Sequence, residues 1–441
     1  MLRVIVRLLE KTKNVNRSIY VWNAVNAMVL AMQSPIVLAV ATRTNGEADA
    51  GIFSIALAEA NLMYFLGQYG LRRYQSSDIK EDYSFSEYHA MRIITTSFML
   101  AGCLLYGLNG IIFKDYSINK FLIIMGVCFI KGIMSYADVL HGHLQQKGRL
   151  DVAGKAATIR YVGELAAYVL ILIIAKNMLL AVIVAMLVSA TLFMLTSYNA
   201  TRFYTDTRKP MISKESFKSL AIEGFPLFTG LFLNMYISNA PKYAIDSFLS
   251  DEIQGIYNMI FMPTYVIQMV AQFIFNPMLT LYAELWLSNS KKKTVRFIIM
   301  IKKMCLVILA LGILAIVLAF TIAIPILSFV FGTDLSNYRN ELCIIMFAGG
   351  MLGYSIYFST LMTVIRAQKP LIYCYGIVSL MALLLSGTFV KNYGITGAAI
   401  LFATLMTLLT ISLIIATILP IRKRMQSLGK RQEIASDSDN V

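Results

Sequence analysis

The apolar segment around residue 131 carries ionisable side chains at helical spacing. Lys131, Ser135, Asp138 and His141 recur every three or four residues, so they share one stripe of a helix. A charge inside a bilayer costs at least about 2.5 kcal/mol on insertion scales, and such a stripe therefore faces a cavity or a partner. Two roles fit it. Either Lys131 binds an anionic group, with Asp138 as its partner or as a protonatable switch, or an ion pair locks this helix to its neighbours.

A second polar ladder contains only uncharged groups. Between Pro263 and Pro277, hydrogen-bonding side chains stand four residues apart, namely Thr264, Gln268, Gln272 and Asn276. Amides and hydroxyls in a line suit sugar hydroxyls or the water of a cavity. They suit interhelical hydrogen bonds equally well, which are worth about 0.6 kcal/mol each. The flanking prolines permit the bends that alternating access requires. A shorter polar face that we expect to line a cavity consists of Asn23, Asn26 and Gln33.

Other charged residues are candidates for ion coupling or for the rim of a cavity. The coupling candidates are Asp138, Glu223 and Glu59. For the two glutamates, a structural or helix-end role is equally open. The candidates for cations at the rim, near the ends of apolar segments, are Arg43, Lys242 and Arg366.

The sequence contains no recognisable catalytic or metal-binding constellation. No P-loop and no paired acidic motif on a loop occur in it. His141 and His143 stand close together but lack a third metal ligand. The five cysteines lie in apolar segments without paired spacing. We therefore expect no catalytic residues, no metal, no cofactor and no enzyme activity.

The elements that position these residues are membrane-spanning helices. Hydrophobic residues make up 58% of the 441 residues and charged residues only 14%, whereas a soluble domain has about a quarter charged. The apolar runs are long and unbroken, as in 177–197 and 306–331, and lack the alternation of barrel strands. We expect an all-α polytopic membrane protein of about twelve spans. The predicted spans are 19–41, 51–71, 91–113, 118–140, 157–175, 178–198, 219–239, 254–276, 304–331, 342–365, 371–390 and 395–419.

Lysine and arginine set the predicted orientation. Most of these 39 residues fall in the first segment, in every second loop after it and in the tail, so both termini are expected to be cytoplasmic. Because the net charge of +15 is spread over these loops, it does not indicate a nucleic-acid partner. The first residues have a basic and an apolar face without a cleavage site, which predicts an interfacial amphipathic helix.

A long polar stretch in mid-chain divides the spans into two sets of six. The expected organisation is a basic amphipathic segment (1–18), an N-lobe (19–205), a cytoplasmic linker (206–218), a C-lobe (219–421) and a polar cytoplasmic tail (422–441). The halves show faint similarity, because Gly51-Ile52 opens the second span and Gly255-Ile256 opens the eighth, each after an acidic loop. Transporters built from such repeats bind substrate between the halves.

Four segments resemble the Wzx-type polysaccharide flippases, which belong to the multidrug/oligosaccharidyl-lipid/polysaccharide exporter superfamily. They are AGIFSIA at 50–56, GQYGLRRYQSSD at 67–78, APKYAI at 240–245 with GIY at 255–257, and YGITGAA at 393–399. The resemblance implies a MATE-like bundle of two six-helix lobes around a V-shaped cavity. It also implies a flippase that moves undecaprenyl-(di)phosphate-linked oligosaccharides across the bacterial cytoplasmic membrane for O-antigen or capsule. The expected partners are this lipid-linked oligosaccharide, membrane lipids and other polysaccharide-assembly proteins, and not nucleic acid.

Two other functions are alternatives to the flippase. A cation-coupled multidrug extruder of the same fold usually has a buried carboxylate in its first span, where this chain has Asn23, Asn26 and Gln33 instead. A membrane-bound polymerase would need a large outer loop, and no predicted outer loop exceeds about twenty residues. Flippases of this superfamily often have several cations in the cavity. Here only Lys131 is expected to lie deep.

Overall fold

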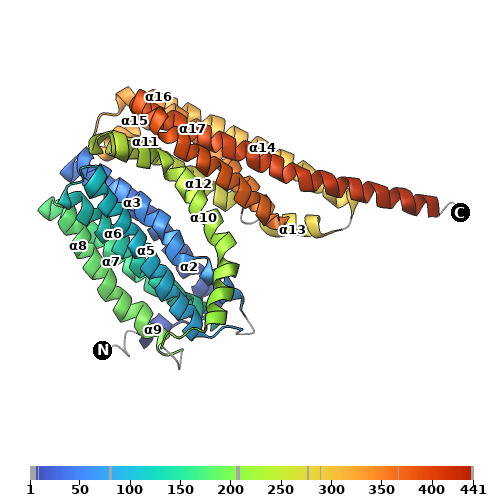
Figure 1. Cartoon of the computed structure of the whole chain (residues 1–441), viewed down its shortest axis with the longest axis horizontal. Coiled ribbons are helices and arrows are strands. Elements are labelled where there is room, and N and C mark those ends of the chain that lie inside the picture. The colour runs from blue at the N-terminus through green and yellow to red at the C-terminus, as the bar shows by residue number, and fades with distance from the viewer. Residues whose placement is uncertain are drawn as a thin grey trace. The chain divides into compact units, whose positions relative to one another are not determined.

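The computed structural model describes residues 6–7, 9–78, 82–204, 209–275, 278–288, 290–365 and 367–438, and these form helices joined by turns and loops, without any strand (Figure 1). The helices before the middle of the chain are α2 (Val15–Asn45), α3 (Glu47–Gln68), α4 (Leu71–Ser77), α5 (Phe85–Phe113), α6 (Ile118–Gln146), α7 (Leu150–Ala175), α8 (Met178–Phe193) and α9 (Asn199–Thr201). The later helices are α10 (Lys214–Phe248), α11 (Asp251–Phe261), α12 (Pro263–Phe275), α13 (Leu279–Leu287), α14 (Lys291–Leu318), α15 (Ile324–Phe331), α16 (Arg339–Val364) and α17 (Gln368–Ser438).

The chain is a multi-pass membrane protein. Among the described residues, ten helices are long and apolar enough to cross a bilayer. The predicted span 254–276 is divided between α11 and α12 at Pro263, so neither piece reaches that length. The predicted spans 371–390 and 395–419 both lie in α17, where Gly394 interrupts the helix with φ 56° and ψ −135°. The number twelve and the cytoplasmic termini stay predictions.

The chain forms two compact units whose boundary runs through α10 and α11. The first unit contains Met1–Met235 and Ser250–Ile256, and the second contains Tyr236–Leu249 and Tyr257–Val441. In the first unit, α3 and α5 both pack on α6, and α7 packs between α2 and α8. In the second unit, α16 packs along α17 and also contacts α12 and α14.

Tyrosines fasten the first part of α10 to the region around α4. The Tyr69 ring stacks on Phe228 with 5.0 Å between centroids. The Tyr74 hydroxyl donates to the Glu223 carbonyl oxygen at 2.7 Å, and burial, reinforced by the Glu223 charge, raises the pKa of Tyr74. The phenol therefore stays a hydrogen-bond donor. This α10 segment is thereby fixed against the end of α3.

The N-terminal segment docks on the ends of α6 and α7. Leu9 is buried in a cluster with Leu144 and Val152. The Lys155 ammonium donates to the Leu9 carbonyl oxygen at 2.8 Å, and Arg149 donates to that of Glu10 at 3.1 Å. Cations at the carboxyl end of a helical turn satisfy carbonyl groups that lack a partner within the helix. For the described residues, the apolar face of this segment therefore packs on protein.

Candidate functional site

The centre of the candidate site is a carboxylate held by two arginines. Asp138 on α6 accepts from Arg92 on α5 through Oδ2 and from Arg72 on α4 through Oδ1, each at 2.9 Å. Arg92 is fully buried and also donates to the Gly67 carbonyl oxygen at 2.7 Å. The Arg72 side chain keeps 34% of its surface exposed. Two guanidinium groups facing one carboxylate leave the cluster with a net positive charge.

The turn between α3 and α4 brings Arg72 back over α6. Tyr69 (φ 48°) and Gly70 (φ 69°) both adopt the left-handed conformation, which reverses the chain after α3. At Gly67, a Cβ would lie 2.6 Å from Ser135 Oγ, so only glycine lets α3 approach α6 this closely. The position of Arg72 therefore depends on two glycines. Gly70 permits the turn, and Gly67 permits the close packing of α3 on α6.

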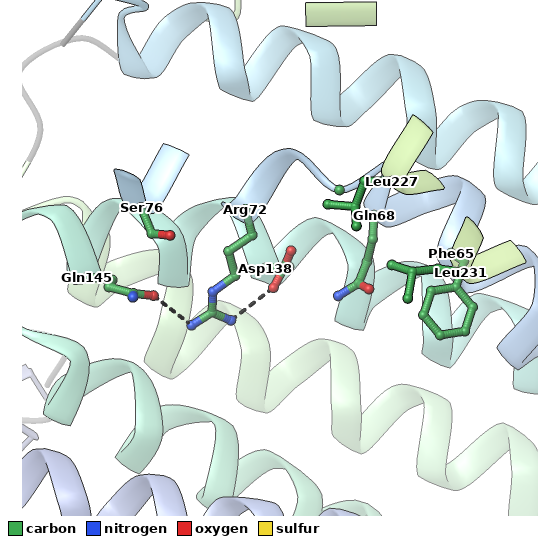
Figure 2. A pocket seen from close by; sticks show the side chains of 9 residues that line it. Phe65, Gln68, Arg72, Ser76, Asp138, Gln145, Leu227 and Leu231 are labelled. Atoms are coloured by element: carbon green, nitrogen blue, oxygen red, sulfur yellow. Dashed lines mark hydrogen bonds and ion pairs between the residues drawn. The ribbon is translucent and has the colours of Figure 1, made fainter. Parts of the chain in front are cut away.

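A cavity of about 440 Å³ opens beside this arrangement, wholly within the first unit. Its polar lining comes from Gln68, Arg72, Ser76, Asp138 and Gln145, and its apolar lining includes Phe65, Leu227 and Leu231. Figure 2 shows Arg72 between Gln145 and Asp138, with the apolar side chains toward the other end. Arg72 donates to Gln145 Oε1 at 3.4 Å as well as to Asp138, which occupies two of its five N–H donors. The remaining donors are available to a ligand.

Lys131 occupies a different and much smaller space. It lines a cavity of about 30 Å³ with Gln33, Tyr161 and Glu164, which has room for one or two water molecules. Of the roles considered for this stripe, the pairing of Lys131 with Asp138 is wrong, because the Asp138 carboxylate binds Arg72 and Arg92 instead. Among the described residues, no hydrogen bond or ion pair reaches the Lys131 ammonium, which lies 5.9 Å from the centroid of the Tyr64 ring.

The rest of the α6 stripe bonds to neighbouring helices. Ser135 shares a hydrogen bond with Thr96 of α5 at 3.1 Å, and His141 with Ser197 at 2.9 Å. The stripe therefore serves two purposes, since Asp138 and Lys131 line cavities whereas Ser135 and His141 join helices.

Helices α5 and α7 bury charged side chains that the sequence pattern does not mark as site candidates. Glu164 accepts from Gln33 Nε2 at 3.0 Å and from Ser189 Oγ at 2.5 Å, and Arg160 Nε lies 3.4 Å from its Oε1. Arg92 and Arg160 lie near the first residues of the predicted spans 91–113 and 157–175, where the sequence predicts cations at a cytoplasmic helix end. The sequence does contain a signal for Arg160. Arg160 and Glu164 stand four residues apart at an apolar run, which is the spacing of an ion pair on one helix face.

The remaining candidates in the first unit lie apart from the large cavity. Asn23 bonds within its own helix, to the Ile19 carbonyl oxygen at 2.7 Å. Asn26 is half-buried on α2, and Arg43 is exposed near the end of that helix. Glu59 is buried on α3. Glu223 accepts from Ser219 at 3.2 Å.

The candidates on the later helices are placed as follows. Lys242 is buried rather than at an exposed rim, and its ammonium donates to Asn258 Oδ1 at 2.8 Å in the second unit. Thr264 is buried and bonds to the Phe261 carbonyl oxygen at 2.7 Å, and Gln268 is half-buried. The Gln272 side chain, Asn276 and Arg366 lie outside the described residues.

Comparisons with known proteins identify a family and a fold. A family model described as "Polysaccharide biosynthesis protein" matches residues 15–281. No curated protein matches the sequence.

Three similar solved structures illustrate the fold. An inward-facing multidrug resistance MATE family transporter of the MOP superfamily has a TM-score of 0.62 at 13% identity, over 92% of this chain and 99% of that one. A MATE in complex with MaD3S has a TM-score of 0.57 at 14% identity, over 96% and 99%. A MOP superfamily transporter from Pyrococcus furiosus, described as having a binding pocket of reverse polarity, has a TM-score of 0.51 at 13% identity, over 96% and 98%.

Proposed function

The chain belongs to the family of polysaccharide biosynthesis proteins, and on this premise we propose that it is a flippase for lipid-linked oligosaccharides. Its family and its MATE-like fold are those of membrane transporters. The proposed substrate is an undecaprenyl-(di)phosphate-linked repeat unit of O-antigen or capsule. It would cross the bacterial cytoplasmic membrane by alternating access of the two halves.

The observation that carries this proposal is the partly exposed Arg72 in the cavity of about 440 Å³. A phosphate that leaves water needs charge-assisted hydrogen bonds, and a guanidinium supplies them in a planar fork. Asp138 holds Arg72 in place but is itself neutralised by Arg92. One positive charge therefore remains for a phosphate of the substrate.

The other walls of the cavity suit the remaining parts of such a substrate. Gln68 donates to the Tyr64 hydroxyl at 2.8 Å, which leaves its carbonyl oxygen for a sugar hydroxyl, and Gln145 keeps its amide donors. Phe65, Leu227 and Leu231 offer an apolar surface to the first units of the lipid. A cavity of several hundred Å³ with few polar groups on an apolar wall is typical of ligand sites.

The second candidate is a cation-coupled multidrug extruder, which the MATE structures among the similar folds favour. Its substrates are cations, and they would approach a cluster of two arginines and one carboxylate. Like charge in a desolvated site opposes such binding. The charge of this cavity therefore favours an anionic substrate.

Reconstitution in proteoliposomes tests the proposal. A labelled undecaprenyl-diphosphate oligosaccharide is incorporated, and a membrane-impermeant enzyme reports the fraction in the outer leaflet. We expect this fraction to change only when the protein is present, and Arg72→Gln to slow the exchange at least tenfold, as for loss of a hydrogen bond to a charged group. Arg17→Gln, which removes an exposed arginine, is the matched control. Expulsion of a cationic dye without movement of lipid would instead identify an extruder.

A further inference from the structure

Eight exposed cations gather at one end of the second unit. They are Lys291, Lys292, Lys293, Arg296, Lys302 and Lys303 of α14 together with Arg422 and Lys423 of α17, and we call them the basic surface. Residues 279–304 and 417–427 contain one carboxylate, that of Glu284. None of the eight forms an ion pair with another described residue. The positive charge of the basic surface is therefore not neutralised from within the described part of the chain.

Arg424 joins the two helices that carry these cations. Its guanidinium donates to the Ser288 carbonyl oxygen at 2.8 Å and lies 4.3 Å from the centroid of the Trp286 ring. Trp286 in turn lies 5.4 Å, between ring centroids, from Phe297 of α14. These contacts tie α13, the start of α14 and the later part of α17 together. They place Arg422 and Lys423 near the lysines at the start of α14, although the two groups lie far apart in the sequence.

The basic surface lies where apolar helices begin and end. On α14, Lys302 and Lys303 directly precede the apolar run up to Phe331, and on α17 the predicted span up to residue 419 ends three residues before Arg422. Such positions lie at the level of the lipid head groups. Leu281 and Leu287 of α13 are exposed beside them, and Leu287 keeps 71% of its surface. The surface therefore presents cations and apolar side chains together, as interfacial binding requires.

We propose that the basic surface binds the head groups of anionic phospholipids of the phosphatidylglycerol type. Charge complementarity identifies the occupant, because each lysine or arginine near an anionic membrane surface strengthens binding about fivefold. Orientation of the protein in the membrane would require only that cations occur on this side. It would not require Arg424 to gather them into one cluster. This inference is independent of the transported substrate.

Trp286 provides a local reporter of bound lipid. The sequence has two tryptophans, so Trp22→Phe leaves Trp286 alone. This protein is reconstituted in phosphatidylcholine bilayers that contain either brominated phosphatidylglycerol or brominated phosphatidylcholine, and quenching of Trp286 is compared. We expect preferential quenching by the anionic lipid. We expect the preference to fall by up to about fivefold per lysine in Lys291→Gln/Lys292→Gln/Lys293→Gln, and to shrink in high salt.

The matched control is Lys209→Gln/Lys214→Gln/Lys218→Gln, which removes three exposed lysines from the first unit and should leave the preference unchanged. If the triple-lysine variant does not insert, the quenching preference is measured in Lys302→Gln/Lys303→Gln instead. The salt dependence of the preference is then measured with all eight cations in place. Equal quenching by the two lipids, or a preference that survives loss of the lysines, would overturn the inference.

Discussion

Gly51 and Gly255 lie in a backbone crossing too close for either residue to carry a side chain. A Cβ on Gly51 of α3 would lie 1.8 Å from the Asp251 carbonyl oxygen, and one on Gly255 of α11 would lie 2.2 Å from that of Glu47. Both glycines belong to the first unit, and an ion pair of 2.6 Å between Lys120 and Asp251 secures the same junction. Close packing therefore requires glycine at both positions, which lie in the two segments that show the faint similarity between the halves.

Gly51→Ala should destabilise the protein by about 1–3 kcal/mol or more, because the added methyl meets backbone that cannot turn aside. Thermal unfolding in detergent measures the effect. Gly230→Ala on α10 is the control, because a Cβ there meets nothing within 4 Å. It should be neutral or stabilise by about 0.5–1 kcal/mol. Equal effects of the two substitutions would show that the crossing is not close.

Arg92 and Arg72 bind the same carboxylate but should respond differently to replacement. Arg92→Gln removes a fully buried partner of Asp138 and should cost about 3–5 kcal/mol of stability. Arg72→Gln removes a partly exposed one and should cost about 1 kcal/mol or less, although it slows transport. Chemical denaturation measures the stability of each variant and the transport assay measures its activity, so together they distinguish a structural role from a role in transport. A strongly destabilised Arg72→Gln would assign Arg72 to structure alone.

Lys131→Met should leave folding and insertion intact, because no hydrogen bond or ion pair to a described residue is lost. The sequence-based hypothesis that Lys131 binds an anionic group of the substrate predicts that transport falls at least tenfold. Arg160→Met is the contrasting variant, because it breaks the buried pair with Glu164 and should lower stability. Normal transport by Lys131→Met would remove this lysine from the site.

Tyr204 should control docking of the N-terminal segment. Its hydroxyl donates to the Glu10 carboxylate at 2.7 Å, and burial together with this bond raises the pKa of Tyr204 to about 12. A raised pKa means that the contact contributes fully below the usual value of 10.0 and is lost as pH rises through about 12. Tyr204→Phe should expose the segment to protease at neutral pH, which limited proteolysis measures. If neither Tyr204→Phe nor a rise in pH through about 12 changed the protection of the segment, Lys155 and Arg149 would suffice to dock it.

Composition alone predicts the class of this protein, because a backbone in lipid must satisfy its own hydrogen bonds and long apolar runs then form helices. The family match over residues 15–281 confirms the resemblance and contains three of the four segments that carry it, whereas the segment 393–399 lies beyond the match. Helical spacing correctly marked Asp138 as a residue on a polar stripe, because that property depends only on residues within one helix.

The partners of Asp138 could not be read from spacing. Arg92 and Arg72 are 46 and 66 residues away along the chain, and only the packing of α4 and α5 on α6 brings them together. The same limit explains why Lys242 was expected at a rim, since burial depends on neighbouring helices. An ion pair requires a separation of a few ångströms in space, and distances between helices arise from the packing of the whole unit.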